Sequence, residues 1–216
     1  YMVNLTIGGG SFKGVYYVGA LEYLYKCKLL DNIENLYGTS VGSIIGILFI
    51  IGYEPYDILK ILIELDFSKY WDLNFNNIEK SYSLLSNKFF IELNNVISKK
   101  ININTTFKEL YENFNINFNV FATSVSNRTV ICFNKDLYPE LQVIRAVQAS
   151  ASIPIIFPPV LINNDYFVDG CFKSVDGIFN NYINNDNIHF IIKGECQIKK
   201  INTFIYYISE LVNCAI

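Results

Sequence analysis

One serine of the sequence lies in the pattern of a catalytic nucleophile. Residues 38–42 read Gly38-Thr39-Ser40-Val41-Gly42, and a G-x-S-x-G sequence between a strand and a helix forms a sharp turn that exposes the serine hydroxyl. The segment 33–37 predicts the strand, and the apolar segment 43–52 predicts the helix. We therefore predict a nucleophile elbow in which Gly38 and Gly42 flank Ser40. The structural alternative is a tight turn that happens to contain a serine.

A second glycine-rich turn begins at residue 8, after the strand-like segment 3–7. It offers successive backbone N–H groups at the start of a predicted helix, where the helix dipole favours an anion. A serine hydrolase needs such donors for its tetrahedral oxyanion, although a glycine turn without this role remains the alternative. Nucleotide binding is disfavoured, because Val15-Tyr16 stand where a phosphate-binding loop has lysine and a hydroxyl residue. The predicted oxyanion hole comprises Gly8, Gly9, Gly10, Lys13 and Gly14.

The serine needs a base, and the single histidine of the chain, His189, begins an apolar run where a lone histidine is usually structural. We predict Asp169 instead, since it ends the strand-like segment 166–168 and precedes Gly170 on a turn that can aim it into a pocket. Burial there would raise the pKa of Asp169 and let it accept the serine proton in a dyad. Two alternatives stay open: an ordinary Asp-Gly turn, and a Ser40-Asp169-His189 triad in the chain order of α/β-hydrolases.

These residues must be positioned by a repeated order of strand, turn and helix, which is typical of α/β proteins. Thr106 and Glu109 have the spacing of a helix capping box, and two predicted hairpins make the sheet mixed. No linker divides the chain, so we expect one domain over residues 1–216. The expected strands are 3–7, 33–37, 118–125, 129–133, 160–162, 166–168 and 189–192, and the expected helices begin at residue 15 and cover 43–52, most of 57–100, 107–114, 140–149 and 203–212.

The composition argues against several other functions. The 216 residues carry a net charge of -3 with no long basic cluster, so nucleic acid is not an expected partner. Five scattered cysteines without a C-x-x-C pair, beside one histidine, argue against structural zinc and favour a reduced environment. No signal peptide and no apolar run of about 20 residues is found. We therefore expect a protein that is cytoplasmic or peripheral to a membrane.

In combination, these motifs resemble the patatin-like phospholipase family. The glycine turn with Lys13, the elbow around Ser40 and the Asp169-Gly170 pair occur in the family's order, and the segments 106–111 and 149–159 are also similar to it. The resemblance implies a three-layer α/β/α sandwich with a mixed, mainly parallel central sheet, and a lipid acyl hydrolase without cofactor or catalytic metal. It further implies that Ser40 is the nucleophile, Asp169 its base, Gly9 and Gly10 the oxyanion donors, and Lys13 an electrostatic support.

The chain departs from the family pattern after the aspartate. Cys171 stands where the family has a small residue, and Asp176 in the altered loop is a second candidate base. A non-catalytic module that binds lipid or a protein partner is therefore a further alternative. We also expect peripheral membrane contact through the aromatic segment 70–75 and Phe89-Phe90, with ordinary core packing as the alternative.

Overall fold

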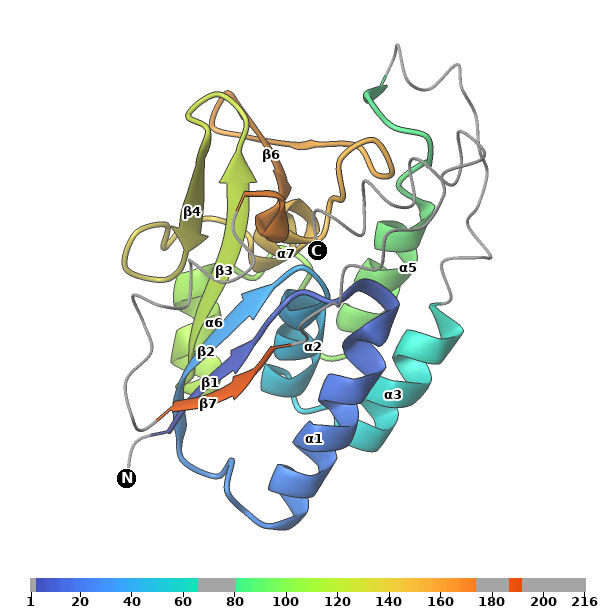
Figure 1. Ribbon diagram of the computed structural model, residues 1–216. Coiled ribbons are helices and arrows are strands. Elements are labelled where there is room, and N and C mark those ends of the chain that lie inside the picture. The colour runs from blue at the N-terminus through green and yellow to red at the C-terminus, as the bar shows by residue number, and fades with distance from the viewer. Residues whose placement is uncertain (1–2, 66–80, 174–186, 192–216) are drawn as a thin grey trace.

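The computed structural model describes residues 3–65, 81–173 and 187–191 (Figure 1). The aromatic segment 70–75, Asp176 and the helix expected at 203–212 lie outside the described residues. Within these described ranges, no helix has the length and apolarity needed to cross a membrane.

A seven-stranded mixed sheet forms the centre of the molecule, in the order β5-β6-β3-β2-β1-β7, with β4 added to β3. Strands β7, β1, β2 and β3 are parallel, while β4 and β6 run antiparallel to β3, and β5 antiparallel to β6. The expected α/β class, with a central, mainly parallel sheet flanked by helices, is confirmed. The strands are β1 (Val3–Ile7), β2 (Ile33–Thr39), β3 (Asn117–Ser124), β4 (Thr129–Phe133), β5 (Val160–Ile162), β6 (Asp165–Asp169) and β7 (Asn187–Phe190).

The helices lie beside this sheet (Figure 1). They are α1 (Gly14–Lys26), α2 (Val41–Ile50), α3 (Pro55–Glu64), α5 (Lys88–Ile97), α6 (Phe107–Phe114) and α7 (Val143–Ser150). Helix α2 has apolar residues on every side and is buried on nearly every side, as is typical of a core helix. It packs closely on the sheet, since a side chain at Gly46 would stand 2.7 Å from Leu36 Cδ2.

The starts of helices α6 and α7 test two local predictions from the sequence. The capping box is confirmed, because Thr106 Oγ1 accepts the Glu109 N–H and the Glu109 carboxylate accepts the Thr106 N–H. The helix expected at 140–149 begins only at Val143, so its predicted start is wrong. The preceding carbonyls are used elsewhere: Pro139 O and Leu141 O accept the first amides of α6. A tertiary contact therefore overrides the local helical pattern.

The edge of β3 brings distant segments together. Residues 117–121 of β3 pair with β2, and residues 122–124 pair with β6. Strand β4 pairs with residues 120–124 of β3, a stretch that includes residues paired with β2 and residues paired with β6. Strand β4 must therefore lie along one edge of β3. Strands β2 and β6 lie end to end along the other edge. Thr39 faces Phe121 and Asp169 faces Ala122. The turn after β2 therefore meets the end of β6.

Candidate active site

Ser40 occupies the turn between β2 and α2, as the G-x-S-x-G pattern predicts. Its backbone has φ 53° and ψ -127°, a sparsely populated conformation for a residue with a side chain. The glycines permit close backbone contacts: a side chain at Gly42 would stand 2.0 Å from Ile7 O, and one at Gly38 would stand 2.7 Å from Ser43 Cα. This is the geometry of a nucleophile elbow.

Buried serines hold this turn in place. The Ser40 N–H donates to Ser150 Oγ at 2.9 Å, and Ser150 Oγ in turn donates to Phe121 O at 2.6 Å. The Ser40 carbonyl accepts both the N–H and the hydroxyl of Ser43. Sequence reasoning missed the role of Ser150. One indication from the sequence that Ser150 matters is its place in the segment 149–159 that resembles the family, but this segment does not show which residue Ser150 contacts.

Asp169 lies against the serine. Ser40 Oγ donates to Asp169 Oδ2 at 2.7 Å, and the Cys171 N–H donates to Asp169 Oδ1 at 2.8 Å. The Asp169 backbone is also fixed, because its N–H donates to Ser152 O and its carbonyl accepts the Thr123 hydroxyl. Ser40 and Asp169 are each only 2% exposed. Each oxygen of the carboxylate thus has a donor from a different loop.

Burial sets the acidity of this carboxyl. Desolvation raises the pKa of Asp169 to about 6, although the hydrogen bonds from Ser40 and from Cys171 oppose the rise. The raised pKa matches the direction expected from the sequence. Near neutral pH the group is ionised, and it accepts a proton more readily than an exposed aspartate does.

The glycine turn contributes fewer free amides than the sequence suggests. The Gly8 N–H donates to Phe190 O, the Lys13 N–H to Gly10 O, and the Gly14 N–H to Ser11 O. These three amides are committed to backbone acceptors, and the Lys13 side chain is exposed. The candidate oxyanion donors therefore narrow to the N–H groups of Gly9, which also faces the Cys171 sulfur, and of Gly10.

The Gly9 turn lies beside Ser40 and is itself held from behind. A side chain at Gly9 would begin 3.5 Å from Ser40 Cβ. The Tyr17 hydroxyl donates to Gly9 O at 2.6 Å. Because a trans peptide places C=O and N–H on opposite sides, this bond directs the Gly10 N–H away from Tyr17. Tyr17 is a second positioning residue that the sequence pattern did not reveal.

His189 does not join this group. It lies on β7 opposite Thr6, its pKa is lowered by burial, and neither ring nitrogen has a hydrogen-bond partner among the described residues. The direct bond between Ser40 and Asp169 leaves no place for an imidazole between them. The geometry is thus that of a Ser-Asp pair. Gly170 allows close packing here, since a side chain on it would stand 2.4 Å from Phe121 O.

Other predicted or observed sites lie apart from this pair. Phe89 and Phe90 are 2% exposed and pack on Phe157, so they belong to the core and their expected membrane contact is wrong.

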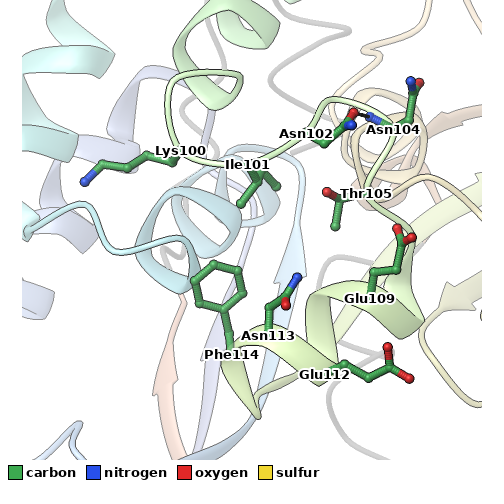
Figure 2. Close-up of a pocket in the computed structure, with 9 residues that line it drawn as sticks. All are labelled: Lys100, Ile101, Asn102, Asn104, Thr105, Glu109, Glu112, Asn113 and Phe114. Atoms are coloured by element: carbon green, nitrogen blue, oxygen red, sulfur yellow. Dashed lines mark hydrogen bonds between the residues drawn. The ribbon is translucent and has the colours of Figure 1, made fainter.

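No group of three metal-ligating side chains occurs in the described ranges. A polar cavity of about 570 Å³ is formed by the segment after α5 and by α6, and Figure 2 shows its lining residues. It contains none of the predicted site residues.

Comparisons with known proteins bear on the family of the chain. The family model described as patatin-like phospholipase matches residues 5–180. The probable lipid hydrolase 463L of Invertebrate iridescent virus 6 is 33% identical over 192 residues, which cover 84% of this chain and 62% of that protein. Lysophospholipase NTE1 of Candida albicans is 26% identical over 170 residues, which cover 78% of this chain and 11% of that protein.

The fold also matches a solved structure. The crystal structure of VipD from Legionella pneumophila aligns with a TM-score of 0.62 over 88% of this chain and 49% of that chain, at 16% identity. At this identity the likeness concerns the fold alone. The chain spans less than two thirds of the length of both curated relatives.

Replacing Ser150 with alanine should destabilise the protein. The change leaves the buried Ser40 N–H without its acceptor, which costs about 1–3 kcal/mol in the free energy of unfolding. Ser152→Ala is the matched control: this serine is equally buried, but its hydroxyl donates to Gln148 O, which also accepts the Ala151 N–H. Denaturant unfolding should show the larger loss for Ser150→Ala. Equal losses would contradict an anchoring role for Ser150.

Replacing Asp169 with asparagine should stabilise the fold at alkaline pH. A carboxyl with a raised pKa favours folding when protonated, and this contribution is lost as the pH rises through about 6. The neutral amide avoids burying a charge, so the gain in Tm should be several degrees at pH 8 and should vanish below about pH 4. Asp165→Asn is the control, because the pKa of Asp165 is lowered. Desolvation raises that pKa, but the hydrogen bonds from Ser124, Ser126 and Tyr166 together outweigh it. A Tm difference for Asp169→Asn that does not depend on pH would refute the argument.

Proposed function

We propose that this chain, which belongs to the patatin-like phospholipase family, hydrolyses fatty-acyl esters of lipids with Ser40 as nucleophile and Asp169 as general base. The observation that carries the proposal is the buried hydrogen bond of 2.7 Å from Ser40 Oγ to Asp169 Oδ2. The substrate class is supported by two of the relatives, which are named as a probable lipid hydrolase and a lysophospholipase.

The first half-reaction forms an acyl-enzyme. Ser40 Oγ attacks the ester carbonyl carbon while its proton passes to the Asp169 carboxylate. The negative charge that develops on the carbonyl oxygen is stabilised by the Gly9 and Gly10 N–H groups, and one such donor contributes about 2.7–4 kcal/mol in the transition state. When the tetrahedral intermediate collapses, the bond to the alcohol breaks, and the protonated Asp169 returns its proton to the leaving alkoxide.

The second half-reaction releases the fatty acid. A water molecule gives a proton to Asp169 and attacks the acyl carbon, which forms a second tetrahedral oxyanion at the same amides. Collapse of this intermediate breaks the bond to Ser40 Oγ, and Asp169 protonates the serine. The net change is one ester and one water converted into one alcohol and one fatty acid, with the enzyme restored.

Hydrolysis of a lipid panel tests the proposal directly. Ser40→Ala and Asp169→Asn should each lower kcat by at least about a thousandfold, because each removes a group that takes part in bond making. Wild-type kcat/KM should fall as the pH drops below about 6, where Asp169 becomes protonated. Panel components differ in headgroup and acyl position, so the same assay identifies the preferred ester.

Two controls make the outcome decisive. Cys27→Ala alters an exposed side chain and should leave the rates unchanged. Labelling with a fluorophosphonate should modify the wild type and spare Ser40→Ala. A folded wild type that neither hydrolyses any lipid ester nor reacts with the probe would contradict the proposed enzyme activity and favour a non-catalytic lipid-binding module.

Exposed aromatic side chains near the proposed site are suited to contact with a lipid surface. Phe12 is 60% exposed and Tyr16 is 72% exposed, both just after the Gly9 turn, and Phe172 is 56% exposed just after Cys171. The exposed residues Lys13 and Lys173 adjoin them and would favour anionic headgroups. We propose that these residues give the protein its peripheral membrane contact.

Vesicle co-sedimentation tests this surface. The double variant Phe12→Ala, Tyr16→Ala should bind vesicles of phosphatidylcholine and phosphatidylserine at least about tenfold more weakly, since it removes two apolar contacts. Tyr23→Ala is the matched control, because Tyr23 lies on α1, as Tyr16 does, and is 68% exposed. Hydrolysis of a soluble short-chain ester should be unaffected in both variants. Equal vesicle binding by all three proteins would exclude this surface.

A further inference from the structure

The polar cavity beside α6 is separate from the Ser40-Asp169 pair (Figure 2). Its walls come from the segment 100–105, which follows α5, and from residues of α6. Its volume of about 570 Å³ lies within the range of small-molecule sites, which is about 300–1,000 Å³. The cavity is therefore large enough for a ligand of its own.

Thr105 is the buried polar residue of this cavity. It is 7% exposed, and its backbone is held on both sides, because its N–H donates to Asn102 O and its carbonyl accepts the Val143 N–H. Its hydroxyl has no hydrogen-bond partner in the described part of the chain, and Figure 2 shows it turned toward the space between the segment 100–105 and α6. Buried hydroxyl groups in proteins normally have a partner. A ligand in the cavity would supply the partner that the protein does not.

The other side chains that face this space are uncharged. Figure 2 shows the Asn113 amide, which comes from α6, pointing toward the same space as the Thr105 hydroxyl. Ile101 and Phe114 add apolar surface, and both pack against the core. An amide has donors and an acceptor, and a hydroxyl can do both. The cavity thus combines polar groups of both kinds with an apolar wall.

The charged residues of the lining are directed elsewhere. Figure 2 shows Lys100 and Glu112 turned away from the cavity, and Lys100 Nζ lies 5.1 Å from the centroid of the Tyr53 ring. The Glu109 carboxylate already accepts the Thr106 N–H in the capping box. An ionic ligand would therefore find no free opposite charge directed at it.

The start of α6 does not offer an anion site either. The N–H groups of residues 107–109 donate to Leu141 O, Pro139 O and Thr106 Oγ1, so they are not available to a phosphate. In the ranges that the structure describes, no three metal-ligating side chains come together. These observations favour a neutral ligand over a charged one.

We propose that this cavity binds a neutral polyhydroxy compound, a sugar ring or another polyol. The Thr105 hydroxyl and the Asn113 amide bind its hydroxyl groups, since each hydroxyl both donates and accepts. Ile101 and Phe114 contact the C–H groups of its ring. A free sugar and the headgroup of a glycolipid present the same groups, so both are sources of this chemistry.

NMR titration of the ¹⁵N-labelled chain tests the site. The probes are methyl glucoside, methyl galactoside and myo-inositol. At least one of them should shift the amide signals of Thr105 and Asn113 and saturate with a Kd of about 1–10 mM, which is weak binding through a few hydrogen bonds. Choline and inorganic phosphate are the ionic comparisons and should leave these signals in place.

Thr105→Val removes the hydroxyl and keeps the shape of the side chain. Binding of the same probe should weaken at least about fivefold, because a hydroxyl of the probe loses its partner. The Tm of the free protein should not fall, since the Thr105 hydroxyl makes no bond there. A hydroxyl with a structural role would instead lower the Tm by several degrees when removed.

Two asparagine variants complete the comparison. Asn113→Ala should weaken binding by a similar factor, because it removes the amide that faces Thr105 across the cavity. Asn95→Ala is the matched control: Asn95 is an exposed asparagine of α5 that does not line the cavity, and this variant should bind as the wild type does. Ser40→Ala should also bind normally, so the result does not depend on ester hydrolysis.

Vesicle co-sedimentation distinguishes the two sources of the ligand. Phosphatidylcholine vesicles are compared with and without glucosyl diacylglycerol. A gain in binding that requires the glycolipid and is lost in Thr105→Val assigns a lipid headgroup, whereas NMR saturation by the soluble probes assigns a free sugar or polyol.

Three results would overturn the inference. The first is that neither method detects binding that depends on Thr105. The second is that choline or phosphate saturates the site in place of the polyols. The third is a fall in the Tm of Thr105→Val, which would show that the hydroxyl serves the fold.

Discussion

The shared edge of β3 is the constraint on which the site depends. One strand, β2, arrives parallel to it and stops opposite Phe121, and another, β6, arrives antiparallel and stops opposite Ala122. The two strand ends are therefore held one residue apart along β3, although Ser40 and Asp169 are separated by 129 positions in the sequence. The buried ladder fixes the backbone of Asp169 and of Thr39, the residue before Ser40. A slip of one residue in either register would turn the side chains to the opposite face.

The same closeness creates costs that the surrounding residues offset. Ser40 has a strained backbone, and its N–H would be buried without an acceptor if Ser150 did not reach it from α7. Asp169 loses its hydration, and only part of that loss is replaced by donors from Ser40 and Cys171. The site thus combines a strained backbone with a buried carboxyl group. Such local destabilisation is typical of positions kept for chemistry.

The sequence allowed the fold class, most elements and the central pair to be predicted, because these follow from local patterns. Ser40 and Asp169 each end a strand on a glycine turn, and both turns leave a signal within five residues of sequence. Ser150 and Tyr17 could not be predicted in this way, since their partners lie on other elements. A run of glycines also does not reveal which of its N–H groups already donate hydrogen bonds. The Gly8 N–H donates to Phe190 O on β7, a strand far away in the sequence.

A direct serine-aspartate contact places a stronger demand on the carboxylate than a triad does. An imidazole has a pKa near neutrality without help, whereas an exposed aspartate is about 2–3 units too acidic to be an efficient base at that pH. Burial supplies the missing basicity, and the donors on Asp169 keep the burial from making the group neutral in the working range. The number of donors must therefore be limited. Too many would restore an ordinary aspartate, and too few would leave it protonated and unable to accept the serine proton.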